Sequence, residues 1–74
     1  MTNNIDAVLD QAYAAYNRGY LEKAEALCRD VLAAEPTQGD ALLLLGLIAY
    51  RSGALEPAVE LLYQAVKLYP DIDN

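Results

Sequence analysis

The chain has 74 residues, which allows one domain with a small core, and its net charge of -6 comes from 11 carboxylates and 5 basic residues. Because the basic residues are scattered and nucleic-acid binding needs a clustered basic face, we expect no nucleic-acid partner. The chain has no histidine and a single cysteine, Cys28, which excludes an internal disulfide and makes a metal site unexpected.

The N-terminal segment and the longest apolar run bear on localisation. The first residues show no basic segment followed by an apolar one, so no secretory signal is expected, and a reducing, cytoplasmic setting suits the single thiol. The apolar run, Ala41 to Tyr50, is about half as long as the roughly 20 residues of a membrane-spanning helix. We therefore expect no membrane span and no membrane partner.

Apolar side chains recur at three- and four-residue steps and predict four amphipathic helices, at residues 3–18, 21–34, 38–52 and 55–68. Gly19 and Gly53 are expected to end the first and third helices, since glycine readily adopts the left-handed conformation common at helix C-termini. Pro36 and Pro70 are expected to end the second and fourth, because proline pushes the preceding residue out of helical geometry. Turns this short make consecutive helices antiparallel neighbours.

Local signals also predict how two of the helices begin. Thr37, with Asp40 three residues later, is typical of a capping box and is expected to open the third helix. Pro57 falls in the first turn of the fourth helix, where a missing N–H costs little.

The chain contains an internal repeat. Shifting the sequence by 34 residues superimposes identical residues, among them Asp6 on Asp40, Tyr16 on Tyr50, Gly19 on Gly53, Ala24 on Ala58 and Pro36 on Pro70. A fixed period of this length is typical of repeat proteins. We therefore expect one domain over residues 1–74, with repeats at about 5–38 and 39–72. Within each repeat, Ala12 or Gly46 is expected to meet Ala24 or Ala58, because small side chains allow two helices to approach closely.

The 34-residue helix-turn-helix pattern resembles the tetratricopeptide repeat. The second repeat carries the resemblance with Leu45, Gly46, Tyr50, Gly53, Ala58, Ala65 and Pro70. The first matches at Gly19, Ala24 and Pro36 but departs at Gln11, Cys28 and Val31, and Gln11 suggests an exposed helix at the end of an array. The resemblance implies an all-α fold of antiparallel helix-turn-helix repeats, stacked as a short right-handed α-solenoid.

The same resemblance implies a module that binds a protein or peptide in a concave groove lined by the first helix of each repeat. The groove candidates carried over are Asp6, Leu9, Tyr13, Tyr16, Asn17, Asp40, Leu43, Leu47, Tyr50 and Arg51. A subclass of the family grips acidic tails with lysine and asparagine, but the matching places here hold Leu9, Tyr13 and Leu44, so that clamp is not expected. An apolar and aromatic groove suits a hydrophobic segment or an amphipathic helix.

No set of residues indicates catalysis. The carboxylates have the spacing of helix first-turn charges, and Cys28 is expected to be a buried core thiol rather than a nucleophile. We therefore expect no enzyme activity, no cofactor and no metal.

The fourth helix carries more apolar surface than one neighbouring helix pair can cover. We expect it to mediate self-association into a homo-oligomer, since repeat arrays otherwise end in a polar capping helix. The residues expected to take part are Leu55, Val59, Leu62, Tyr63, Val66 and Tyr69.

Two other interpretations of the chain remain open. The segments AEALCRDVLAAEP and ALLLLGLIAYRSGALEPAVELLYQAVKLYP resemble repeats that precede bacterial glycosyltransferases of the O-linked N-acetylglucosamine transferase type. The chain would then be the N-terminal repeat segment of a larger enzyme, which the reading frame beyond Asn74 would reveal. The third interpretation is an excised or engineered repeat pair.

Overall fold

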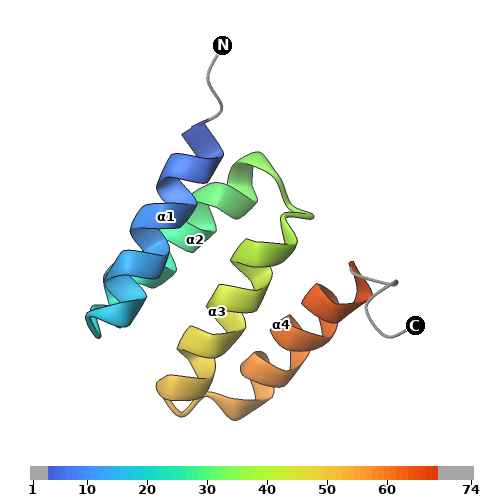
Figure 1. The fold of residues 1–74 in the computed structure, drawn as a ribbon. Helices are drawn as coiled ribbons and strands as arrows, with labels where there is room; N and C mark the ends of the chain where they lie inside the picture. Colours follow the sequence, from blue (N-terminus) through green and yellow to red (C-terminus); the bar gives the residue numbers. More distant parts are fainter. Residues whose placement is uncertain (1–3, 69–74) are drawn as a thin grey trace.

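A computed structural model describes residues 4–68 of the chain as four α-helices (Figure 1). They are α1 (Asn4–Asn17), α2 (Leu21–Ala34), α3 (Gly39–Arg51) and α4 (Leu55–Lys67). Every predicted helix is present, and its bounds differ from the prediction by no more than one residue at either end. The all-α prediction is confirmed.

The helices form two antiparallel hairpins, α1–α2 and α3–α4, which lie side by side (Figure 1). The hairpins meet mainly where α3 packs on α2, with a smaller contact between α3 and α1. Within residues 4–68, α4 contacts no helix other than α3. The first hairpin is therefore covered by α3 on one side. Helix α4 lies at the edge of the described fold, with a helix on one side only.

The turn inside each hairpin has the predicted glycine geometry. Gly19 and Gly53 have φ angles of 85° and 87°, in the left-handed region where a Cβ is unfavourable. After each glycine the chain turns back by the same hydrogen bond: the Tyr20 N–H donates to the Ala15 carbonyl at 2.9 Å, and the Ala54 N–H donates to the Ala49 carbonyl at 2.9 Å. The two hairpin turns thus have the same backbone structure, as the internal repeat predicts.

The connection between the hairpins corrects one prediction. Helix α2 ends at Ala34, before Pro36, as expected. Helix α3, however, is capped by Gln38, whose side-chain oxygen accepts a hydrogen bond from the Asp40 N–H at 3.0 Å. The predicted Thr37 cap is therefore wrong by one residue. Pro57 lies in the first turn of α4, as predicted, and Pro70 lies outside the described residues.

The larger core cluster combines small side chains of the first hairpin with large ones of α3, and a second cluster joins Leu9 and Val31 of the first hairpin to Ala41 of α3. Ala12, Ala24 and Cys28 have no exposed area, and Leu44 of α3 is equally buried in the same cluster. The full cluster is Ala12, Ala15, Ala24, Cys28, Leu44, Leu45 and Ile48. Alanines in the first hairpin make room for the leucines and isoleucine that α3 brings in.

The second hairpin has a close approach between Gly46 and Leu62 that the sequence pattern did not predict. A Cβ placed on Gly46 would lie 2.8 Å from Leu62 Cγ and 3.3 Å from the Leu62 backbone nitrogen. Gly46 therefore packs closely against Leu62. The position 34 residues before Gly46 is Ala12, and the one before Leu62 is Cys28. A larger residue on α4 is matched by a smaller one on α3.

Candidate interaction surfaces

Residues 4–68 show no arrangement that suggests bond-making chemistry. No group of three or more His, Cys, Asp or Glu side chains in this range lies close enough to hold a metal ion. The Cys28 thiol has no exposed area, and burial, with a smaller contribution from Glu25, raises its pKa to about 11. A nucleophilic cysteine needs the opposite shift. Cys28 is a buried core thiol, as predicted.

One surface lies along α1 and α3 and holds half of the predicted groove residues. We call it the α1–α3 face and define it by Tyr13, Tyr16, Leu43, Leu47 and Tyr50. The first four are half-buried, and Tyr50 is 63% exposed. Leu43, Leu47 and Tyr50 share one side of α3, because residues three and four apart align along a helix. The face is apolar at its base and aromatic at its edge.

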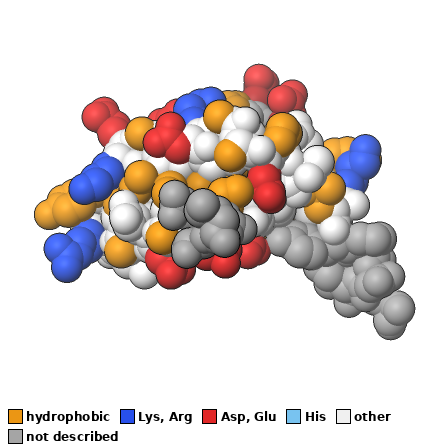
Figure 2. Space-filling model, turned by 90° about the horizontal axis from the view of Figure 1, so that it is seen from above, with side chains coloured by type: hydrophobic (Ala, Val, Ile, Leu, Met, Phe, Trp, Pro, Cys, Tyr) orange, Lys and Arg blue, Asp and Glu red, His pale blue; other side chains and the backbone are white. Residues whose placement is uncertain are grey.

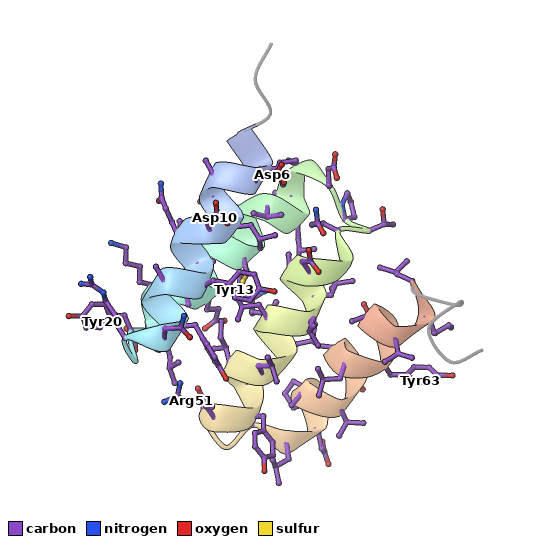
Figure 3. All side chains as sticks on the ribbon, in the orientation of Figure 1. Asp6, Asp10, Tyr13, Tyr20, Arg51 and Tyr63 are labelled. Atoms are coloured by element: carbon purple, nitrogen blue, oxygen red, sulfur yellow. The ribbon has the colours of Figure 1, made fainter. Side chains whose placement is uncertain are left out.

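Tyr13 connects the two helices of this face in its middle (Figure 3). Its ring packs against both core clusters. Burial is the main reason that the pKa of the Tyr13 hydroxyl is raised, and the nearby Asp40 carboxylate raises it further. The hydroxyl therefore stays neutral at physiological pH and lies close to the first turn of α3.

Arg51 connects α1 and α3 at the other end of the face (Figure 3). Its guanidinium Nη1 donates to the Tyr16 carbonyl at 3.3 Å, and its Cζ lies 5.0 Å from the centre of the Tyr16 ring. A cation over an aromatic ring is attracted by about 0.5–1 kcal/mol at an exposed site. Arg51 thus holds the ends of α1 and α3 together and keeps Tyr16 in place.

The remaining groove candidates divide into exposed and buried residues. Asp6, Asn17 and Asp40 are exposed. Leu9 is only 6% exposed and is buried with Val31 and Ala41. Leu9 belongs to the core, so its assignment to a partner-binding surface is wrong. The cause is its location on the side of α1 that α3 covers.

The second surface is the outer side of α4. Four apolar side chains lie along it with spacings of four, four and three residues, and we call them the α4 stripe: Leu55, Val59, Tyr63 and Val66, which are 56%, 66%, 64% and 60% exposed. Figure 3 shows Tyr63 pointing away from α3. The Lys67 ammonium lies 5.2 Å from the centre of the Tyr63 ring.

The other two predicted self-association residues differ from the stripe. Leu62 is half-buried, because its side chain packs on Gly46, so only part of it borders the stripe. Tyr69 lies outside the described residues.

The structure also shows features that the sequence interpretation missed. Tyr20, in the turn of the first hairpin, is 58% exposed and points away from the helices (Figure 3). A cavity of about 170 Å³ lies between the hairpins, lined by residues of α2, α3 and α4, among them Glu25, Arg29 and Ile48. Neither follows from helix periodicity, because both depend on how elements meet.

Charged side chains are spread over the side of the molecule that Figure 2 shows. In the view of Figure 2, Lys and Arg side chains stand toward the edges, and Asp, Glu and hydrophobic side chains are interspersed between them. Within residues 4–68, no helix is long and apolar enough to cross a membrane.

No protein-family model and no curated protein matches the chain. The tetratricopeptide assignment therefore stays a prediction from the sequence pattern.

Proposed function

We propose that the protein is a non-enzymatic interaction module of two tetratricopeptide-like repeats. Its α1–α3 face takes an apolar peptide or an amphipathic helix, and its α4 stripe takes part in self-association. The observation that carries the proposal is the α1–α3 face itself, where half-buried Leu43 and Leu47 adjoin exposed Tyr50.

The chemistry of this face favours a helical or extended apolar segment over a charged one. Leucine and tyrosine side chains provide apolar area, and tyrosine is enriched where partners contribute most to binding. Asp6 and Asp40 add negative charge near one end of the face. A partner segment with apolar residues three or four apart and a basic residue near that end fits the face best.

The rigidity of the face also supports binding. The contact of Arg51 with Tyr16 holds the two helices at one end, and the packing of Tyr13 on both core clusters holds them in the middle. A preformed face loses less conformational entropy when a ligand binds.

Binding can be tested with peptides selected from a random displayed library against the whole chain, with the best peptide then measured by fluorescence anisotropy. Leu47→Glu is expected to weaken that peptide at least about tenfold, since it buries a charge under the ligand. Val59→Glu, on the α4 stripe, is the matched control and is expected to leave the affinity unchanged. Equal binding by wild type and Leu47→Glu would exclude the α1–α3 face.

A further inference from the structure

Two residues of the α4 stripe differ in character from their equivalents in the first hairpin, whereas Leu55 and Val66 correspond to half-buried Leu21 and Leu32. The residues 34 positions before Val59 and Tyr63 are Glu25 and Arg29. These two form an ion pair of 2.8 Å, and their side chains remain 41% and 66% exposed although α3 packs on that hairpin. The place that is charged and solvated in the first hairpin is apolar in the second.

This difference restricts what can cover α4. A helix that packed on the second hairpin as α3 packs on the first would leave Val59 and Tyr63 at the solvent edge, as α3 leaves Glu25 and Arg29. Continued stacking of repeats therefore does not explain these two side chains. An occupant that covers Val59 and Tyr63 together with Leu55 and Val66 lies along the outer side of α4.

The opposite end of the molecule is a poor occupant. Helix α3 meets the first hairpin through apolar residues that include Leu44 and Leu45. The residues of α1 at the equivalent positions are Asp10 and Gln11, which are both exposed. Stacking the α1 end of one copy on the α4 end of another would bury these polar groups without partners, at a cost of roughly 1–3 kcal/mol each.

The stripe is complementary to itself. We propose that α4 pairs antiparallel with α4 of a second copy, about a two-fold axis near the middle of the helix; this rests on the self-association part of the proposed function. In that register Leu55 lies opposite Val66 of the other copy, and Val59 lies opposite Tyr63. Both partners of each pair are more than half exposed in the single chain.

The charges beside the stripe select the antiparallel orientation. Glu56 lies in the first turn of α4 and Lys67 in the last, on the same flank of the stripe. An antiparallel two-fold axis brings the same flank of both helices to one side, so Glu56 of each copy lies beside Lys67 of the other. A parallel pair places the two flanks on opposite sides and loses both contacts. Antiparallel helix dipoles favour the same arrangement.

The contact is small, because one helix contributes most of it and standard interfaces cover about 800 Å² per partner. Sedimentation equilibrium of the whole chain from about 20 µM to about 1 mM covers the range for such a weak dimer. The wild type is expected to pass from monomer to dimer across this range. The double variant Val59→Glu with Tyr63→Arg, which copies the Glu25–Arg29 pair, is expected to stay monomeric.

The matched control is Tyr20→Arg, which removes an equally exposed tyrosine at the far end and is expected to dimerise like the wild type. Circular dichroism of every variant checks that the helices are retained. Because Val59 and Tyr63 are exposed and the new pair repeats an i, i+4 contact of α2, the double variant is expected to keep the wild-type spectrum.

Charge reversal tests the orientation. Glu56→Lys and Lys67→Glu are each expected to weaken the dimer roughly threefold to tenfold, since two exposed ion pairs are lost per dimer. The two substitutions together restore the pairs and are expected to return the affinity to the wild-type value. A double variant as weak as the single ones would overturn the antiparallel register.

The remaining outcomes separate this proposal from the broader one. A dimer that survives Val59→Glu with Tyr63→Arg uses another surface and overturns the α4 pairing alone. A wild type that stays monomeric at about 1 mM overturns the self-association part of the proposed function as well. Peptide binding at the α1–α3 face is measured independently in both cases.

Discussion

The two hairpins have matching helices and turns, but they differ in their neighbours. The second helix of the first hairpin, α2, packs against the other hairpin, whereas α4, within residues 4–68, contacts only α3 of its own hairpin. In the first hairpin, Leu9 and Cys28 are covered by α3. In the second, the equivalent Leu43 and Leu62 are only half-buried. Identical local structure therefore does not imply identical packing, because burial depends on what lies next to each hairpin.

The largest expected effect contrasts two buried alanines that have different neighbouring helices. Ala24 has no exposed area and is buried beneath α3, whereas Ala58 of α4 has only α3 beside it. Ala24→Leu is expected to lower the free energy of unfolding by about 3 kcal/mol, because the added atoms cannot move outward. Ala58→Leu is expected to cost about half as much, since α4 can shift away from α3. Urea unfolding measures both.

A loss below about 1 kcal/mol for Ala24→Leu would contradict the tight packing of the first hairpin. Equal losses of stability for the two variants would mean that α4 does not shift away from α3 more easily than the helices of the first hairpin shift from one another. The exposed Ala14→Leu on α1 is the control for helix propensity.

An intermediate effect concerns the thiol that only the first hairpin contains. Burial raises the pKa of Cys28 to about 11, from an ordinary value of 9.0. Above pH 9 the unfolded chain loses this proton while the folded chain keeps it, so the unfolded state binds fewer protons. The stability contribution is therefore full below about pH 9 and is lost as the pH rises through about 11.

We expect this loss to be about 1–2 kcal/mol between those two pH values. Cys28→Ala should show a flatter decline over the same range, with the part due to Tyr13 retained, because burial also raises the pKa of that hydroxyl. Thermal melts at a series of pH values measure the difference. Parallel curves for wild type and Cys28→Ala would show that the thiol titrates normally in the folded chain.

The smallest expected effect comes from replacing Gly46 and Leu62 by the residues at the equivalent positions of the first hairpin. Gly46→Ala places a methyl group 2.8 Å from Leu62 Cγ and is expected to cost about 1 kcal/mol, after the better helix propensity of alanine is included. Adding Leu62→Cys reproduces the Ala12 and Cys28 pair of the first hairpin. In the double variant the alanine is expected to cost nothing further, because the smaller side chain leaves room for its methyl group.

A double-mutant cycle, measured under reducing conditions, gives the coupling between the two positions, expected to be about 1 kcal/mol. Additive effects would show that Gly46 and Leu62 do not constrain one another. They would also mean that the smaller residue at position 46 is not explained by the larger residue at position 62.

Local signals predicted the fold well and the surfaces less well. Gly19, Gly53 and Pro36 act within a few residues, so the helix ends follow from them. The cap of α3 is Gln38 and not Thr37. Both side chains are polar and adjacent in the sequence, so the sequence pattern alone does not distinguish them.

The assignment of surfaces depends on the placement of whole helices, which residue spacing does not specify. Leu9 has the same periodicity as its groove neighbours, yet α3 covers it. The contact of Gly46 with Leu62 likewise depends on how α3 and α4 are placed against one another. The contrast between Glu25–Arg29 and Val59–Tyr63 was readable from the repeat, but its meaning required knowing that the first pair stays solvated.

In the dimer proposed above, Asp10 and Gln11 limit how many copies join. With these exposed polar side chains on α1, each molecule of that dimer would associate through α4 alone, and the pair would close on itself. A chain with leucine at both positions would present at its other end the residue types that α3 presents to the first hairpin. Such a head-to-tail contact does not close, and repeated contacts of this kind build fibres. In the proposed assembly, these two polar residues of α1 would limit growth to a dimer.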